Sequence, residues 1–362
     1  MSRFRTIAAL VVTIALAVVA CGPSSGSTVG PSVGPSVGPS ASASPASPAS
    51  PSVGPSREPV ALTVGLGFIP SVQFAPFYLA DQAGYYAEAG LTVELQNKID
   101  PDLILLVGQG ALDIGLGDGT SVIPAVSQDI PVKYVATVYG QFPSIVFAKA
   151  SSGIASAADL KGKRIGIPGR YGSSWVMLQA LLASAGLTPD DVRVVQYPDF
   201  GQGAAVAQGA VDAATGFVNN EPVQLQLTGE QVNVLHIDDI TPLPGNGLIT
   251  GTATLETKSE AIAAFIAATL RAMEDITARP EIGLEAAFKA VPELATQRDT
   301  QAAILDATIA AWRGKAQVAH GLGAIEPADW TASITYLTSL GLVDHPVTAE
   351  DVLEIGLLPA GG

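Results

Sequence analysis

The residues of this chain with the clearest capacity for recognition are aromatic, and they crowd into one short stretch. Phe68, Phe74, Phe77, Tyr78 and Tyr85 lie close together, although aromatic residues make up only 6% of the chain. Flat apolar rings can stack on a planar ligand, and each stacked pair contributes about 0.5–1.5 kcal/mol beyond the area that it buries. Any single ring could equally be an ordinary core residue, so both roles stay open for each of them.

Three further segments combine glycines with hydrogen-bonding side chains at the end of an apolar run. Residues 117–121 read Gly-Asp-Gly-Thr-Ser, residues 166–175 read Gly-Ile-Pro-Gly-Arg-Tyr-Gly-Ser-Ser-Trp, and residues 217–222 read Phe-Val-Asn-Asn-Glu-Pro. Glycines let the backbone approach a ligand closely, and the neighbouring polar groups can fix its orientation, although they could also cap the following helices. The candidate ligand-binding residues are Phe68, Gln73, Phe74, Phe77, Tyr78, Asp118, Thr120, Tyr139, Tyr171, Ser173, Ser174, Trp175, Asn219 and Glu221.

Residues that would support catalysis are not arranged for it. His236, His320 and His345 are far apart and form no metal-binding motif, and neither a G-x-S-x-G nucleophile elbow nor a P-loop occurs. Cys21 is the only cysteine, so the rest of the chain can hold no cysteine–metal site. We therefore expect no catalytic residue, no metal site and no cofactor. The formal net charge of −15 also argues against nucleic acid as a partner, because binding to the phosphate backbone needs clustered basic residues.

Strands and helices alternate along the segment that would position these loops. Residues 60–66 alternate apolar side chains as a strand does, Pro76 suits the first turn of a helix, and Gly90 suits its end. The alternation continues to about residue 237, which predicts an α/β fold with mainly parallel sheets and helices on both faces. From Lys258 the chain is expected to be mainly helical, with an apolar core stripe at three- and four-residue spacing over residues 262–276.

Three motifs resemble those of a known family. Phe-Ala-Pro-Phe-Tyr at 74–78, Gly-Tyr-Tyr at 84–86 and Asp-Leu-Lys-Gly-Lys at 159–163 resemble extracytoplasmic substrate-binding proteins of ABC importers, in the group that includes thiamine-pyrimidine, taurine/sulfonate and riboflavin binders. The resemblance covers roughly residues 61–295. It implies a two-lobed periplasmic-binding-protein-like fold of type II, with two crossovers and a cleft that closes by a hinge motion. Alternation alone would also allow one larger doubly wound domain.

The expected lobe boundaries follow from that resemblance. Lobe 1 would comprise residues 60–148 and 250–362, and lobe 2 residues 149–249, with the first crossing near 147–152. The partners that the family implies are a small-molecule ligand and an ABC permease in the membrane.

The residues available for the cleft also favour one class of ligand. Asn219 and Glu221 resemble the Asn-Glu signature that pyrimidine-binding and riboflavin-binding members carry at the end of this strand. The candidate loops are rich in flat apolar faces and neutral hydrogen-bonding groups and poor in cations, whereas a small anion would require more than one placed Arg or Lys. We therefore expect riboflavin, with a thiamine-pyrimidine precursor or a sulfonate such as taurine as alternatives. The related pyrimidine synthase uses a cysteine-rich, histidine-dependent site that this chain lacks, so we expect a receptor and not an enzyme.

The N-terminal residues predict export and membrane attachment. Residues 1–20 contain Arg3, Arg5 and an apolar run from Ile7 to Ala20, which is typical of a secretion signal and too short for an ordinary spanning helix. Val-Val-Ala-Cys at 18–21 resembles a bacterial lipobox and predicts lipidation of Cys21, although an uncleaved signal anchor is the alternative. Residues 21–59 are almost only Ser, Pro, Gly, Ala, Val and Thr, which predicts a disordered tether. The body would thus be lipid-anchored to the cell membrane on its extracytoplasmic side.

Overall fold

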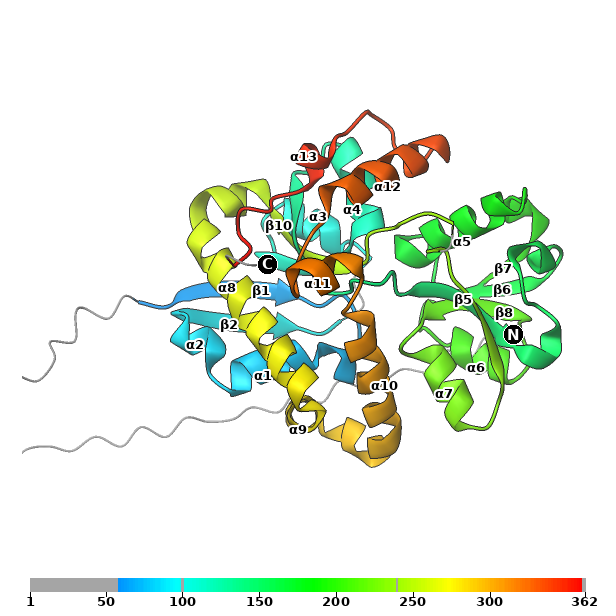
Figure 1. Cartoon of the computed structure of the whole chain (residues 1–362), viewed down its shortest axis with the longest axis horizontal. Helices are drawn as coiled ribbons and strands as arrows, with labels where there is room; N and C mark the ends of the chain where they lie inside the picture. The colour runs from blue at the N-terminus through cyan, green and yellow to red at the C-terminus, as the bar shows by residue number, and fades with distance from the viewer. Residues whose placement is uncertain (1–57, 99–100, 239, 360–362) are drawn as a thin grey trace, which may run out of the picture. The chain divides into compact units, whose positions relative to one another are not determined.

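The computed structural model of the chain describes residues 58–98, 101–238 and 240–359 (Figure 1). The predicted signal peptide, Cys21 and nearly all of the predicted tether lie outside these ranges. No helix within the described ranges is both long and apolar enough to cross a bilayer.

Five strands form the first sheet, in the order β2-β1-β3-β10-β4. They are β1 (Val60–Gly65), β2 (Leu91–Gln96), β3 (Ile114–Asp118), β4 (Val132–Thr137) and β10 (Asn246–Gly251). β1 pairs in parallel with β2 and β3, whereas β10 runs antiparallel to both β3 and β4. Val64, Ile114 and Ile249 are fully buried at the centre of this sheet, as expected for strands that are covered on both faces.

A second sheet has the order β7-β6-β8-β5-β9. Its strands are β5 (Ser144–Lys149), β6 (Arg164–Ile167), β7 (Arg193–Gln196), β8 (Ala213–Phe217) and β9 (Val232–Leu235). β6 pairs in parallel with β7 and β8, and β5 is antiparallel to β8 and β9. The prediction of an α/β fold with mainly parallel sheets is confirmed, with one antiparallel strand among the described strands of each sheet.

The chain crosses between the two sheets earlier than predicted. β5 follows β4 directly and already pairs in the second sheet, so the first crossing occupies residues 138–143 and the prediction of 147–152 was wrong. The return crossing ends before Asn246, where β10 begins in the first sheet, a few residues before the predicted boundary at 250. The physical reason is that an apolar strand pattern carries no information about the sheet in which the strand finds its hydrogen-bonding partners.

Helices cover both sheets. Those before the return crossing are α1 (Ala75–Gln82), α2 (Tyr85–Glu88), α3 (Leu103–Gly108), α4 (Gly119–Ser127), α5 (Gly172–Ser184), α6 (Gln202–Ala207) and α7 (Glu221–Leu227). Those after it are α8 (Thr252–Ala278), α9 (Pro280–Ala290), α10 (Arg298–Ala311), α11 (Lys315–His320), α12 (Pro327–Ser339) and α13 (Ala349–Val352).

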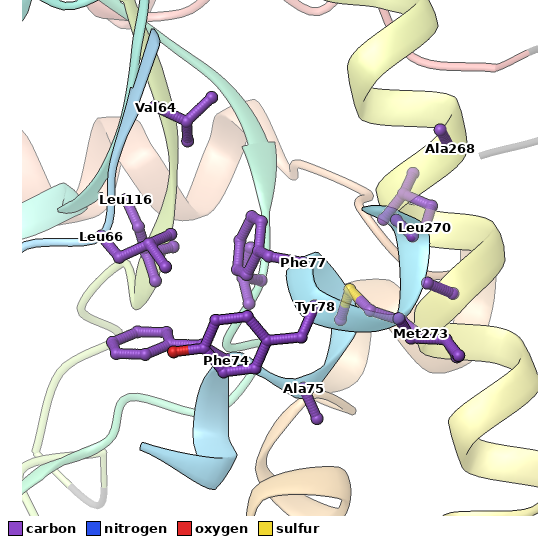
Figure 2. Packing of buried hydrophobic residues seen from close by; sticks show 14 of the residues in the cluster. Val64, Leu66, Phe74, Ala75, Phe77, Tyr78, Leu116, Ala268, Leu270 and Met273 are labelled. Atoms are coloured by element: carbon purple, nitrogen blue, oxygen red, sulfur yellow. The ribbon is translucent and has the colours of Figure 1, made fainter. Parts of the chain in front are cut away.

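The long helix α8 packs across α1 and α2 and closes the core of the first sheet (Figure 1). Phe265 of α8 stacks on Tyr86 with ring centroids 4.9 Å apart and an interplanar angle of 9°. Ile262, Ile266 and Met273 on the same face are fully buried. Figure 2 shows this cluster, in which side chains of α1 meet those of α8 and of the sheet. The predicted apolar stripe is therefore core, as expected.

The remaining C-terminal helices do not all lie behind the first sheet. α12 and α13 pack there, with Trp330 of α12 against Tyr134 of β4 at a centroid distance of 4.6 Å. α10, however, contacts α7 beside the second sheet (Figure 1). α10 therefore joins the two halves of the molecule, because its Ile304 and Leu305 are also buried in the core cluster of the first sheet.

Candidate ligand-binding site

A cavity of about 240 Å³ lies where β3 of the first sheet and β8 of the second sheet end. Strand ends of this kind are the usual ligand position in α/β folds, because loops and helix N-termini converge there. Both sheets supply walls, since Leu116 and Asp118 belong to β3 whereas Gly216 and Phe217 belong to β8.

The apolar part of the wall consists of aliphatic and aromatic side chains. Leu66, Phe74 and Leu116 line the cavity and are themselves packed into the core cluster of the first sheet. Phe68, which follows β1, meets Phe200, which precedes α6, in an edge-to-face contact with ring centroids 4.8 Å apart and an interplanar angle of 81°. The loop with Phe68 follows a strand of the first sheet and the loop with Phe200 follows a strand of the second sheet, so the pair links the two sides of the cavity.

Phe200 holds an unusual backbone conformation. Its φ is 59°, in the left-handed region that bulky residues rarely adopt. Such strain costs on the order of 1–3 kcal/mol and persists where surrounding structure enforces it, often at ligand sites. The strained backbone aims the Phe200 ring at Phe68.

Asp118 presents a carboxyl group to the cavity from the start of α4. Its Oδ1 accepts hydrogen bonds from the backbone N–H of Ser121 at 2.9 Å and from the hydroxyl of Thr120 at 2.8 Å. Burial raises the pKa of Asp118, while these donors and the backbone N–H of Ser173 oppose that rise. Thr120 therefore orients Asp118 and is itself fully buried, away from the lining.

Glu221 presents a second carboxyl group, from the first turn of α7. Oε2 accepts from the backbone N–H of Phe217 at 2.9 Å, and Oε1 accepts from Gln202 Nε2 at 3.3 Å. Burial raises the pKa of Glu221 to about 7, and the backbone N–H of Phe217 opposes part of that rise. Near neutral pH this carboxyl can therefore act either as a donor or as an acceptor.

The neighbouring amide is consistent with a protonated Glu221. Gln202 Oε1 is buried and has no hydrogen-bond partner among the described residues. The two ends of an amide are assigned from their surroundings, and rotation of this one would place Oε1 opposite the carboxyl. A protonated Glu221 would then donate to Gln202 Oε1, and Gln202 Nε2 would take the position that has no partner among the described residues.

Eight of the predicted binding residues do line the cavity. They are Phe68, Gln73, Phe74, Asp118, Tyr171, Ser173, Ser174 and Glu221. Tyr171 is the most open of them, at 39% exposure, whereas the Ser173 hydroxyl accepts a buried hydrogen bond from Ser144 at 2.8 Å. Loops at strand ends thus supply the lining as expected.

Two aromatic residues of α1 that were predicted to bind the ligand face the core instead. Phe77 is 1% exposed and stacks loosely on Phe265, with centroids 6.3 Å apart. Tyr78 is buried, donates from its hydroxyl to Asn97 Oδ1 at 3.0 Å, and has its pKa raised to about 12 by burial. Figure 2 labels both rings within the packed cluster. The rotation of α1 against α8 decided this, and the sequence motif cannot reveal it.

Asn219 and Tyr139 lie behind the cavity in a buried polar network. Asn219 Nδ2 donates to Thr308 Oγ1 of α10 at 2.8 Å and to Tyr139 Oη at 3.3 Å. The Tyr139 hydroxyl donates to Gln73 Oε1 at 3.1 Å, and Gln73 reaches the lining. Asn219 therefore ties the end of β8 to α10 and to the first crossing, and it is not among the residues that line the cavity.

Trp175 also lies outside the lining. Its indole packs beside the core cluster that contains α5, and the guanidinium carbon of Arg170 lies 4.9 Å from its ring centroid. Arg170 thus rests on Trp175 and is not among the residues that line the cavity.

Several lining residues were not predicted. Phe200 and Gln202 follow β7, and a loop after a predicted strand was the signal that could have found them. Asn220 adjoins two predicted residues. Asn246 begins the antiparallel strand β10, and no sequence pattern points to it.

The described part of the cavity lining carries no basic side chain and no cluster of metal-binding groups. None of the described residues that line the cavity is Lys, Arg or His. Over the described ranges, no group of three or more His, Cys, Asp or Glu side chains gathers in a way that could hold a metal ion.

The sequence is similar to one protein family and to several named binding proteins and synthases. The family described as NMT1/THI5 like matches residues 71–282. The riboflavin-binding protein RibY of Chloroflexus aurantiacus is 33% identical over 328 residues, covering 88% of this chain and 92% of that protein. The formylaminopyrimidine-binding protein of Halalkalibacterium halodurans is 28% identical and covers 80% and 88% of the two chains. The 4-amino-5-hydroxymethyl-2-methylpyrimidine phosphate synthase of Legionella pneumophila is 29% identical and covers 65% and 75%.

Solved structures share the fold. The aliphatic sulphonate binding protein SsuA of Escherichia coli superimposes with a TM-score of 0.63 at 20% sequence identity, over 82% of this chain and 97% of that one. This similarity assigns the architecture to the periplasmic-binding-protein-like fold.

Proposed function

This chain belongs to the NMT1/THI5-like family, and we propose that it is the solute-binding component of an ABC importer that takes riboflavin into the cavity between its two sheets. The observation that carries the proposal is the cavity lining, which pairs apolar and aromatic walls with amide, hydroxyl and carboxyl groups and holds no cation among its described residues. A planar, uncharged heteroaromatic ring is the ligand that such a lining suits. The extensive match to a riboflavin-binding relative supports the choice of flavin.

Each wall has a separate task in this proposal. Phe74 and Phe217 offer ring faces or edges to the flavin, while Gln202, Asn220 and Asn246 offer amides to its polar edge. The cavity of about 240 Å³ lies below the range of about 300–1,000 Å³ in which drug-sized ligands are usually bound. We propose that each sheet and its helices form one lobe, and that a hinge motion separates Phe68 from Phe200 to admit the ligand.

A pyrimidine such as a thiamine precursor is the second candidate. The small cavity favours it, because one six-membered ring needs less space than three fused rings. The formylaminopyrimidine-binding relative supports the same alternative. A sulfonate is disfavoured, since an anion would meet two carboxyl groups and no cation among the described lining residues.

Binding without turnover is part of the proposal. The synthases among the relatives mean that family membership alone leaves catalysis open. The lining contains no cysteine or histidine among its described residues, so it lacks the groups that the synthase site would use. A receptor should return its ligand chemically unchanged after denaturation, which chromatography of the released ligand would check.

Attachment to the membrane remains a proposal from the sequence. We propose that residues 1–20 are a signal peptide, that Cys21 is lipidated, and that residues 22–59 tether the body on the extracytoplasmic side. The tether would then hold the receptor near its permease. Mass spectrometry of the purified protein should find the lipid on Cys21, and an unmodified N-terminus would contradict the anchor.

A fluorescence-quenching titration of the full chain with riboflavin tests the function. We expect saturable quenching with one-to-one stoichiometry. No response from protein shown to be folded by circular dichroism would exclude riboflavin. A thermal-shift series with pyrimidines and sulfonates would then identify the solute class.

A further inference from the structure

We infer that the cavity takes the unphosphorylated form of its solute and rejects the phosphomonoester, because Asp118 and Glu221 place two carboxyl groups in its lining and no described lining residue is basic. The inference rests on the proposed function, since it names the chemical form of the solute that the same cavity binds. For riboflavin, the excluded compound is riboflavin 5′-phosphate.

The start of α4 is closed to an anion by the chain itself. Backbone N–H groups at a helix N-terminus ordinarily form an anion-binding site. Here Asp118 Oδ1 takes the N–H of Ser121 at 2.9 Å and the hydroxyl of Thr120 at 2.8 Å. A phosphate oxygen would have to displace this carboxyl to reach either donor.

The same carboxyl group also reaches the start of α5, on the other side of the cavity. A Cβ atom built on Gly172 would lie only 3.8 Å from Asp118 Oδ2, which places the carboxyl against the first turn of α5. One aspartate therefore caps α4 and places its carboxyl group beside the first turn of α5.

Glu221 uses the donor that the second sheet offers. The backbone N–H of Phe217, at the end of β8, points to Glu221 Oε2 at 2.9 Å. The other oxygen of this carboxyl group, Oε1, accepts a hydrogen bond from Gln202 Nε2 at 3.3 Å. An anionic ligand would compete with a side chain that is already in place.

No positive charge compensates for these carboxyl groups within the described lining. Arg170 belongs to the loop that contributes Tyr171, yet its guanidinium rests on the Trp175 ring at 4.9 Å. A phosphomonoester carries about 1.5 to 2 negative charges at neutral pH. In a partly desolvated site it would repel ionised carboxylates, because like charges are poorly screened there.

Rejection of the phosphomonoester has a consequence for the supply of solute. A phosphorylated form outside the cell must first lose its phosphate by hydrolysis. Water breaks the P–O bond to the alkyl oxygen, and inorganic phosphate and the free alcohol are released. The receptor therefore depends on a phosphomonoester hydrolase wherever the available solute is phosphorylated.

Titration of the full chain with riboflavin and with riboflavin 5′-phosphate tests the inference at pH 8. Both compounds share one chromophore, so fluorescence quenching reports them equally. We expect the phosphate to bind at least a hundredfold more weakly than riboflavin. Comparable affinities, within tenfold, would overturn the inference.

Matched variants separate charge repulsion from damage to the site. Asp118→Asn and Glu221→Gln combined should narrow the ratio of the two dissociation constants at least tenfold, while Glu260→Gln, an exposed carboxyl on α8, should leave it unchanged. If the two carboxyl groups had a purely structural role, the double variant would bind both flavins more weakly by the same factor. An unchanged ratio of the two dissociation constants in the double variant would therefore refute the inference that these carboxyl groups reject the phosphate.

If riboflavin is not the ligand, the titrations give a result that differs from failure of the inference about phosphate. If neither flavin binds, riboflavin is excluded, and calorimetry with 4-amino-5-hydroxymethyl-2-methylpyrimidine and its phosphate repeats the comparison. Preference for the unphosphorylated pyrimidine would support the inference. Preference for its phosphate would overturn it.

Discussion

Replacing Glu221 by Gln should stabilise the protein at pH 8 and do so much less at pH 5. Burial raises the pKa of this carboxyl from 4.5 to about 7. A group whose pKa is raised by folding contributes stability that is present below its unfolded pKa and is lost as the pH rises through its folded pKa. The wild-type protein therefore loses stability as the pH rises from about 4.5 to about 7. The Glu221→Gln variant does not lose this stability, because the Gln side chain stays neutral.

The size of the effect follows from the same shift. One pKa unit corresponds to about 1.4 kcal/mol, so the ionised carboxylate costs about 3 kcal/mol at pH 8. The amide keeps one oxygen for the N–H of Phe217, and its NH₂ can donate to Gln202 Oε1 after the Gln202 amide rotates. Imperfect replacement of these hydrogen bonds costs about 1 kcal/mol. The expected net gain at pH 8 is therefore about 2 kcal/mol.

Urea unfolding followed by tryptophan fluorescence, at pH 5 and at pH 8, measures this difference. Glu260→Gln makes the same chemical change on the surface of α8 and should alter the free energy of unfolding by less than about 0.5 kcal/mol at either pH. The reasoning is refuted if Glu221→Gln is less stable than wild type at pH 8, or if its effect is the same at both pH values.

Three further substitutions probe the assignments of the polar network, the strained loop and α1. Asn219→Ala should lower the free energy of unfolding by about 1–3 kcal/mol, because Thr308 and Tyr139 lose their buried hydrogen-bond partner. If the variant loses ligand affinity but keeps its thermal stability, Asn219 contacts the ligand and the prediction is wrong. Phe200→Gly should be more stable than Phe200→Ala in urea unfolding by about 1 kcal/mol, because only Gly adopts a φ of 59° without strain, and the reverse order would contradict the strain. Tyr78→Phe should leave the riboflavin titration unchanged while losing one hydrogen bond to Asn97, and a tenfold weaker affinity would place Tyr78 in the site.

Local pattern was enough to predict most strands, most helices and the class of fold. Alternating apolar residues at 60–66 and the pair Pro76 and Gly90 are properties of a few neighbouring residues, so they mark β1 and the helical segment after it without reference to the rest of the chain. Sheet membership is different, because a hydrogen-bond ladder joins distant segments. β5 and β10, the first strand after each crossing, are the strands that run antiparallel in their new sheets, and nothing in their local sequences indicates that direction.

For the candidate site, the sequence by itself determined four of the loops that supply the lining and the chemistry that they offer. Phe68, Asp118, Ser173 and Glu221 follow predicted strands, and strand ends converge in an α/β fold whatever the details of packing. Tertiary structure alone decided which side chains of each loop reach the cavity. Phe74 lines it while Phe77 and Tyr78 pack into the core (Figure 2), because the docking of α1 on α8 sets the rotation of the helix. It also decided the raised pKa of Glu221, since that pKa depends on burial beside residues that lie apart from it in the chain.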